Sequence, residues 1–235
     1  MKKFLIYITI IVSLSVNAQE TVYPAPKQVG STVITNATVH VGNGQVLNNA
    51  TIVITDGKIA AVGNNISIPP GSTQVNAQGK QVYPGLILPV SNLGLVEIGA
   101  VRASNDVQEL GDMNPNIHSI VAYNTDSKVI NTLRSNGILL ANVVPEGSFV
   151  AGQSSVVQLD AWNYEDAAYK TDGGLHVYMP LLLARPRRFR GAGPQQPDVD
   201  PVKEGLEKVD ELKGFFHEAK ALFTCQYSKA NACGT

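Results

Sequence analysis

Charged and aromatic residues are scarce in this chain of 235 residues. Asp, Glu, Lys and Arg together make up 16% of the sequence and aromatic residues 6%. Basic and acidic residues number 18 and 19, so the chain lacks the excess positive charge of a nucleic-acid-binding protein. Apolar residues make up 44%, which is enough for a hydrophobic core and argues against a disordered chain. We expect a folded protein of one large domain or two smaller ones.

Residue types that commonly bind metals are also few. Cys225 and Cys233 lie near the C-terminus, where they could either close a small disulfide loop or remain free thiols. The histidines are His40, His118, His176 and His217. None belongs to a His-x-His or His-x-x-x-His pair, the spacings that place two ligands on one metal. The sequence therefore predicts no catalytic, cofactor-binding or metal-binding residue, and it leaves His118 as a polar residue that could line a cleft.

Residues 1–18 have the pattern of a secretory signal peptide. Lys2 and Lys3 precede an apolar run over residues 4–16, and Val16-Asn17-Ala18 supplies the small residues of a cleavage site. The apolar run is shorter than the roughly 20 residues that a membrane-spanning helix needs, which disfavours the alternative of a retained anchor. We predict cleavage near Ala18 and an exported protein, periplasmic or secreted, with no stable membrane anchor.

Short β-branched segments separated by turns follow this leader. Strands are predicted over residues 32–41, 50–55, 58–62 and 74–76. Asp56-Gly57 is the strongest hairpin signal in the chain, and Asn36 interrupts the first strand. Several strands at such short spacing predict an all-β unit that ends near Tyr83.

The stretch VYPGLILPVSN, residues 82–92, changes this pattern. Pro84-Gly85 forms a turn that leads into residues 86–90, an apolar strand without alternation that is expected to be buried on both faces, as in a parallel sheet. A helix is predicted over residues 126–136, with Asp126 as N-cap and Gly137 as its stop, and strands over 138–144 and 154–159. Helix, buried strand, glycine-containing loop and strand are typical of a β/α barrel segment.

These stretches resemble the amidohydrolase superfamily, in particular its imidazolonepropionase-like, metal-dependent hydrolases. The resemblance rests on "NATVHVGNG … TIVITDGKIAAVG … NAQGKQVYPGLI" and on "SNGILLANVVPEGSFVAGQSSVVQLDAW", and it covers residues 29–169. It implies a β-sandwich part followed by the opening βα units of a (β/α)8 TIM-type barrel. It also implies hydrolysis of C–N bonds in cyclic amides or dipeptide-like substrates, with zinc as the cofactor in family members.

The metal ligands that the resemblance implies are absent. In the family a PGLID turn enters the first barrel strand, which carries an aspartate and then a His-x-His pair. Leu88, Val90 and Asn92 stand at those three positions here. An amide oxygen is a weak ligand, and leucine and valine offer none. We therefore expect no metal in this chain and a catalytically incompetent protein.

Length limits the barrel as well, because a family barrel needs about 250 residues and only about 150 follow Tyr83. The chain is expected to be either a natural truncation or a fragment. The predicted division is a signal peptide (1–18), a β-sandwich part (19–84), an incomplete barrel (85–179), a Pro- and Arg-rich linker (180–201) and a helix with a tail (202–235). The helix is predicted over residues 202–222, and the linker holds an arginine cluster: Arg185, Arg187, Arg188 and Arg190.

Two functions remain open at this point. The chain is either an amidohydrolase-family protein that has lost catalysis or an exported binding or scaffold protein built on the same framework. The second interpretation includes self-association or a partner chain that completes the barrel. Glu97, Asp106, Glu109 and Asp112 follow the apolar strand, but their spacing matches no acid–base pair, so we expect a solvated loop.

Overall fold

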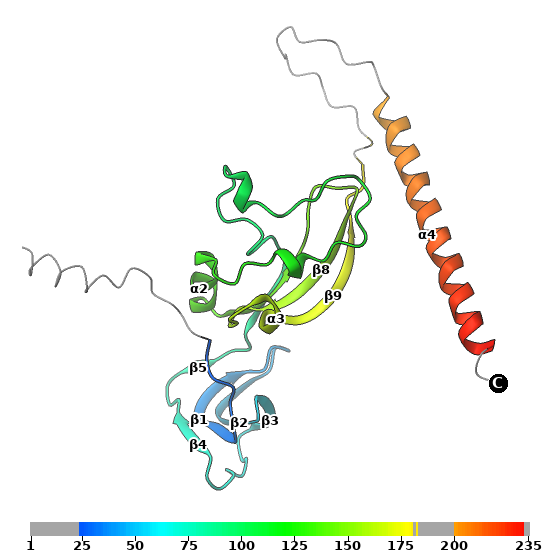
Figure 1. Ribbon diagram of the computed structural model, residues 1–235. Helices are drawn as coiled ribbons and strands as arrows, with labels where there is room; N and C mark the ends of the chain where they lie inside the picture. Colours follow the sequence, from blue (N-terminus) through cyan, green and yellow to red (C-terminus); the bar gives the residue numbers. More distant parts are fainter. Residues whose placement is uncertain (1–23, 181, 183–199, 233–235) are drawn as a thin grey trace, which may run out of the picture.

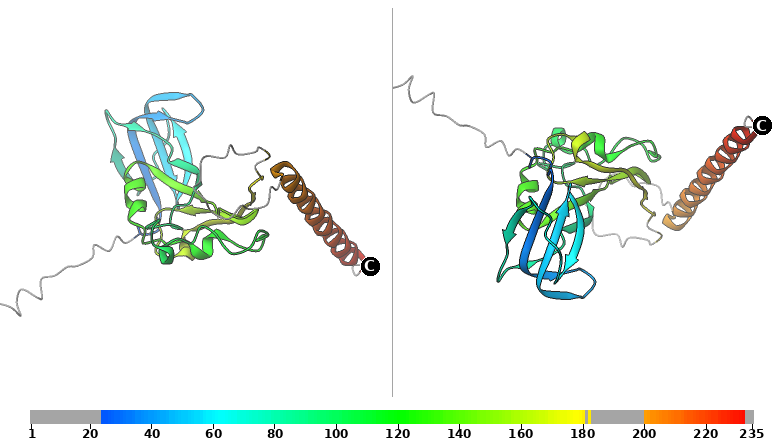
Figure 2. Two further views of the ribbon diagram at one scale, coloured as in Figure 1. Left: turned by 90° about the horizontal axis from the view of Figure 1, so that it is seen from above. Right: turned by 90° about the horizontal axis from the view of Figure 1, so that it is seen from below.

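The structure of the protein, a computed structural model, describes residues 24–180, 182 and 200–232. It contains two β-sheets and a long C-terminal helix (Figure 1). The first sheet uses residues up to Val82, and the second begins at Leu86. Two further views show the helix extending away from both sheets (Figure 2). The predicted signal peptide and the arginine cluster lie outside the described residues.

The first sheet is mixed and follows the predicted order of strands. Its strands are β1 (Ser31–His40), β2 (Val46–Thr55), β3 (Lys58–Gly63), β4 (Thr73–Asn76) and β5 (Gln81–Val82). β1, β2 and β3 pair antiparallel in succession, whereas β4 and β5 pair parallel with β1. Asp56 and Gly57 both have positive φ, as a tight hairpin turn requires. Asn36 has φ 60° at the point where β1 loses its regular register with β2.

The second sheet contains one parallel βαβ unit. Its strands are β6 (Leu86–Ser91), β7 (Ile138–Val143), β8 (Val150–Gln158) and β9 (Ala168–Val177), in that order across the sheet. β6 and β7 are parallel, and the crossover between them contains η1 (Arg102–Ser104), η2 (Ser119–Ala122) and α2 (Lys128–Ser135). The helix and the strand after it were predicted, whereas the described strands form an open sheet and not a barrel.

The next strands depart from the predicted β/α alternation. β8 pairs antiparallel with β7, and β9, which follows the short helix α3 (Tyr164–Ala167), pairs antiparallel with β8. The 144–149 connection is too short for the crossover that a parallel neighbour needs, so the chain can only turn back. β9 was not predicted, because its Gly173-Gly174 pair is typical of a turn.

The prediction that residues 86–90 are buried on both faces is wrong for this structure. Leu86, Ile87 and Val90 are 59%, 62% and 66% exposed, and only Leu88 packs against the core. β6 is the outer strand of its sheet, so β7 covers one edge and the other edge has no strand beside it in the described part of the chain. Apolar composition alone could not reveal that the neighbouring strand is absent.

The helix boundaries differ modestly from the predicted ones. Ser127, not Asp126, occupies the N-cap of α2, and Gly137 (φ 84°) follows its end as predicted. α4 (Pro201–Ala232) begins where predicted but continues ten residues beyond Leu222, through a segment without apolar periodicity. Cys225 is a free, exposed thiol on α4, and Cys233 lies outside the described residues. None of the helices in the described part is long and apolar enough to cross a membrane.

The larger hydrophobic core lies between the second sheet and the crossover that carries α2. Its buried members are Leu93, Leu95, Ile120, Tyr123, Ile130, Ala141, Val143, Val157, Leu159 and Ala167. Gly94 makes this packing possible, because its φ is +71° and an added Cβ would lie 2.6 Å from the Tyr123 ring. The Tyr123 hydroxyl is buried without a hydrogen-bond partner, and burial raises the pKa of Tyr123 to about 12.

Tyr123 should therefore make the folded state sensitive to alkaline pH. Because the pKa is higher in the folded than in the unfolded state, its stabilising effect is present below pH ~10 and disappears as the pH rises from about 10 to 12. The loss should reach about 2–3 kcal/mol. We expect Tyr123→Phe to flatten this part of the profile of unfolding free energy against pH, measured by urea denaturation. Tyr83→Phe, at an exposed tyrosine, is the control, and identical profiles for Tyr123→Phe and the parent would contradict the expectation.

Candidate functional site

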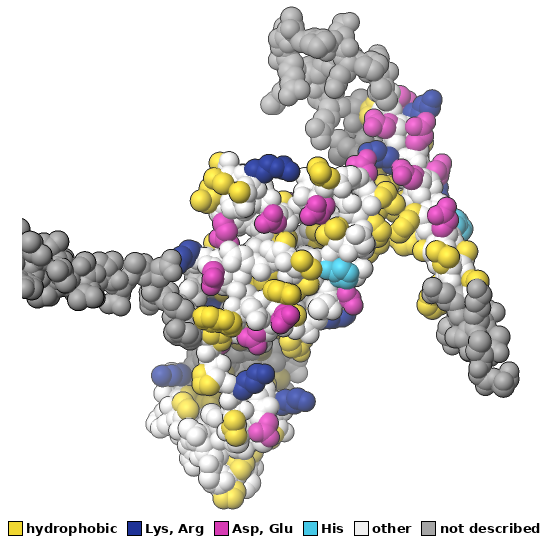
Figure 3. Space-filling view, in the orientation of Figure 1, with side chains coloured by type: hydrophobic (Ala, Val, Ile, Leu, Met, Phe, Trp, Pro, Cys, Tyr) yellow, Lys and Arg dark blue, Asp and Glu magenta, His cyan; other side chains and the backbone are white. Residues whose placement is uncertain are grey.

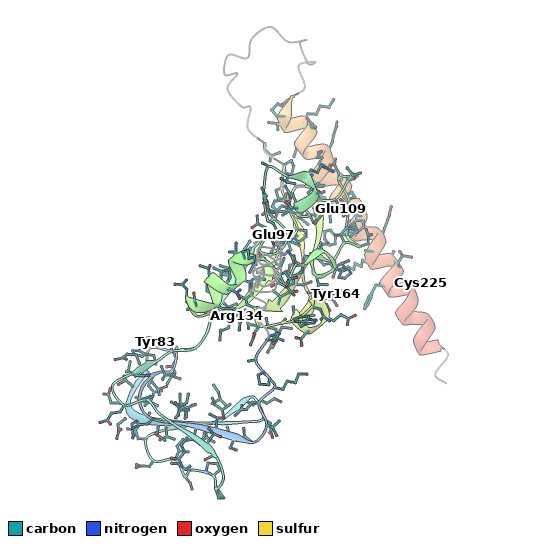
Figure 4. The ribbon with its side chains drawn as sticks, turned by 60° about the vertical axis from the view of Figure 1, so that its left-hand side comes forward. Tyr83, Glu97, Glu109, Arg134, Tyr164 and Cys225 are labelled. Carbon is teal, nitrogen blue, oxygen red and sulfur yellow. The ribbon has the colours of Figure 1, made fainter. Side chains whose placement is uncertain are left out.

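A concave site lies at the carboxyl ends of β6 and β7, where parallel strands usually present their functional loops. It is a cleft of about 200 Å³. Its walls are formed by Leu95, Asp106, Val107, Glu109, Asn116, Ile117, His118, Ser119, Val121, Ala122 and Pro145. Apart from Pro145, which follows β7, all of these come from the crossover between β6 and β7. Figure 4 shows that Glu109 and Glu97 occupy separate parts of this region.

Backbone pairing with β8 holds one wall of the cleft in place. The Asn114 amide donates to the Val150 carbonyl (2.8 Å), and the Gln153 amide donates to the Ile117 carbonyl (2.7 Å). The Ser119 hydroxyl is buried and donates to the Val143 carbonyl at the end of β7 (2.8 Å). The 114–119 segment is thus fixed between β7 and β8, which aligns His118 with the cleft.

His118 and Asp172 form a polar pair at this wall. The His118 Nδ1 atom lies 3.4 Å from an Asp172 carboxylate oxygen, and both side chains are partly exposed. His118 therefore lines a cleft, as the sequence allowed. The other histidines lie elsewhere: His40 stacks on Tyr83 in the first sheet, His176 lies in β9 and His217 on α4. Burial lowers the pKa of His176, which favours its neutral form.

The carboxylates after β6 separate into two groups. Asp106 and Glu109 are exposed to solvent, as expected of a solvated loop, and they also line the cleft. Glu97 has a structural role instead, because it accepts hydrogen bonds from Asn124 Nδ2 and Ser127 Oγ, both 3.1 Å, at the start of α2. Asp112 pairs with Lys208 of α4 at 3.5 Å. Only the folding of the crossover brings Asp106, Glu109 and His118 to one place.

The positions that carry metal ligands in amidohydrolases do not form a metal site here. Leu88 packs against the core, Val90 is exposed and Asn92 is exposed at the end of β6. In the described part of the chain, no three His, Cys, Asp or Glu residues lie close enough together to hold a metal ion. The residues present therefore do not fit the zinc site that the fold suggests, and no metal-assisted step can be derived for them.

Nucleophilic chemistry is no better supported. Ser154 and Ser155 are buried in β8, where their hydroxyls donate to the Gly174 carbonyl (3.4 Å) and to the Thr171 carbonyl (2.7 Å). These bonds join β8 to β9, and neither serine has a histidine base beside it. What the cleft offers is binding chemistry: an acidic and apolar lining with one histidine.

A second concavity lies at the opposite end of the β6–β7 pair. This groove, about 450 Å³, is lined by Gly85, Ile87, Arg134, Leu139, Leu140, Gln158, Leu159 and Asp160. Arg134 forms a 2.7 Å ion pair with Asp160 at its rim. The other Asp160 carboxylate oxygen accepts a hydrogen bond from the Ala25 amide (3.2 Å), so the segment before β1 contacts the second sheet. The groove is continuous with the exposed side chain of Ile87 on β6.

Solved structures resemble this fold, although no protein-family model and no curated protein matches the sequence. An amidohydrolase from Thermotoga maritima MSB8 superposes with a TM-score of 0.63 at 22% identity, over 81% of this chain and 49% of that protein. The chain therefore has the fold of part of that protein and spans about half its length. Molinate hydrolase and D-hydantoinase align at 32% identity, over 30% and 29% of this chain, with TM-scores of 0.27 and 0.25. These two likenesses are too partial to support an argument.

Gly152 should be required for stable packing of residues 114–119, the wall of the cleft that carries His118, against β8. Its φ is +127°, and a Cβ there would lie 2.8 Å from the Ile117 carbonyl oxygen. We expect Gly152→Ala to lower the free energy of unfolding by about 2 kcal/mol or more, because it combines backbone strain with a clash against backbone. Gly174→Ala on neighbouring β9 is the matched control, since nothing lies within 4 Å of its added Cβ. Equal losses in urea denaturation would show that the Gly152 contact does not hold the wall.

Proposed function

We propose that this chain is the N-terminal portion of an amidohydrolase-superfamily protein of the imidazolonepropionase-like branch, and that it is catalytically incompetent on its own. The motif over residues 82–92 and the likeness to the Thermotoga maritima amidohydrolase support the relationship. The lineage points to hydrolysis of C–N bonds in small amides as the reaction of the complete enzymes. This chain has the fold of part of those enzymes but lacks the side chains that would bind a metal at the first ligand positions.

The replacement of ligands at that position supports the loss of catalysis. A metal-dependent hydrolase activates water with ligands that converge on one or two cations. Leu88 and Val90 have no donor atom, and Asn92 has only an amide. The cleft residues Asp106, Glu109 and His118 do not lie close enough together to hold a metal ion. A binding role is therefore the function that this geometry supports best.

The observation that carries the binding role is the uncovered apolar strand β6. Its side chains Leu86, Ile87 and Val90 are exposed beside an apolar groove, and its outer edge has no strand beside it among the described residues. Contiguous exposed apolar surface of this kind marks an interaction site or an aggregation hazard. A strand parallel to its neighbour and apolar throughout is typical of a sheet covered on both faces.

We infer that further polypeptide packs against the β6 surface and covers its exposed apolar side chains. The Thermotoga maritima protein contains about as much chain again as the part that matches. Two copies of β6 are poorly suited to cover each other edge to edge, because Pro89 lies in the middle of the strand and lacks an N–H. The predicted signal peptide would place this assembly outside the cytoplasm.

Metal content tests the proposed loss of catalysis. We expect the purified chain, eluting as a defined species in size-exclusion chromatography, to carry no stoichiometric zinc or manganese by elemental analysis. The triple variant Leu88→Asp, Val90→His and Asn92→His should remain metal-free, because the described part of the chain has no ready-made group of ligands to complete the site. One or two ions per chain in the parent protein would overturn the proposal.

The β6 surface can be tested independently of metal. We expect Ile87→Ser with Val90→Ser to reduce the binding of a hydrophobic dye and the formation of large aggregates, with little change in unfolding free energy because both side chains are exposed. Leu110→Ser with Val121→Ser, at equally exposed apolar residues outside the β6 surface, is the control pair. If the control pair lowers dye binding and aggregation as much, β6 is not a distinct interaction surface.

A further inference from the structure

α4 carries a seven-residue repeat of apolar residues along one side of the helix. The seven positions of the repeat are lettered a to g, with Val202 at position a. Large apolar residues recur at the a positions: Val202, Val209, Phe216 and Phe223. The d positions hold Gly205, Leu212 and Ala219. The g positions hold Lys208, Phe215 and Leu222. These a, d and g positions, here called the α4 seam, form one continuous stripe of three heptads, roughly 33 Å long.

Most of the α4 seam is accessible to solvent. Its start contacts the body, where Gly205 lies against Leu182 and Lys208 reaches Asp112. Farther along, Phe216 is 51% and Leu222 65% exposed, and hydrophobic side chains are visible along the helix (Figure 3). An isolated helix in water gains little stability from propensity alone, so such a stripe normally needs a packing partner.

Charges on the two sides of the α4 seam indicate which partner fits. Glu204, Glu211 and Glu218 repeat every seven residues at the c positions on one side. Lys213 and Lys220 repeat at the e positions on the other side. Both columns lie about 100° around the helix from the centre of the seam, in opposite directions. The Lys213–Asp210 contact (2.7 Å) is an exposed pair and holds Lys213 only weakly.

We propose that α4 pairs with α4 of a second copy as a parallel two-stranded coiled coil. In a parallel pair, opposite sides of the two helices face each other, so each glutamate column meets the partner's lysine column. An antiparallel pair would place glutamates against glutamates and lysines against lysines. Ala219, a small residue at the centre of the seam, allows the two helices to approach closely beyond the part that contacts the body.

This inference is independent of the proposed amidohydrolase descent and of the β6 surface. Pairing through α4 would hold two copies together at their C-terminal helices and leave β6 and the cleft uncovered in each copy. A surface that recruits a further polypeptide would then be present twice in each dimer.

Charge reversal on the full chain tests the pairing. Light scattering after size exclusion should show a dimer for the parent protein. Glu211→Lys with Glu218→Lys should weaken self-association at least about tenfold, as should Lys213→Glu with Lys220→Glu, because each variant places like charges on both sides of the seam. An equimolar mixture of the two variants should restore a dimer. A monomeric parent at ~100 µM, or a mixture that fails to associate, would overturn the proposal.

Cross-linking tests the direction of the pair. In a background of Cys225→Ser and Cys233→Ser, oxidation should join two copies of Ala219→Cys, which lies in the seam. Ala221→Cys, on the outer face of α4, is the matched control and should remain unlinked. Equal linking at both positions would contradict the parallel arrangement. The Ile87→Ser and Val90→Ser variant should still dimerise, so loss of the dimer there would assign association to β6 instead.

Discussion

The parallel pairing of β6 with β7 is the constraint on which the rest of the structure depends. A parallel neighbour requires a long crossover, and here residues 92–137 supply it. The crossover packs α2 and Tyr123 against one face of the sheet and leaves its polar residues at the carboxyl ends of the two strands. The crossover between β6 and β7 therefore forms part of both the hydrophobic core and the cleft.

β6 carries Leu88 and Val90 and is followed by Asn92, three residues that together offer only one amide as a metal ligand. The polar groups that do converge, Asp106, Glu109 and His118, come from the crossover and from the pairing of residues 114–118 with β8. A shared fold thus gives no assurance of a shared reaction, because reactivity depends on particular side chains. The cleft that Asp106, Glu109 and His118 line is acidic and apolar, with one histidine.

Two apolar surfaces remain uncovered, and their chemistry differs. The β6 surface belongs to a sheet edge beside an apolar groove, so it suits a partner that adds to the fold. The α4 seam is a helical stripe between a glutamate and a lysine column, so it suits a partner with the same pattern. The two surfaces lie on separate elements, which would allow dimerisation and recruitment of another chain to occur together (Figures 1 and 2).

The sequence by itself determined the features that depend on neighbouring residues. Asp56-Gly57 imposed a hairpin, Asn36 shifted the register of β1 with β2 and Gly137 ended α2, because each acts through its own backbone conformation. The sequence also determined the apolar strand after Pro84-Gly85 and the heptad pattern of α4. Tertiary structure alone decided that β6 lies at a sheet edge and is exposed, that β8 and β9 run antiparallel, and that Asp106, Glu109 and His118 share one cleft. Those outcomes depend on which segments become neighbours in space, and no local pattern of residues contains that information.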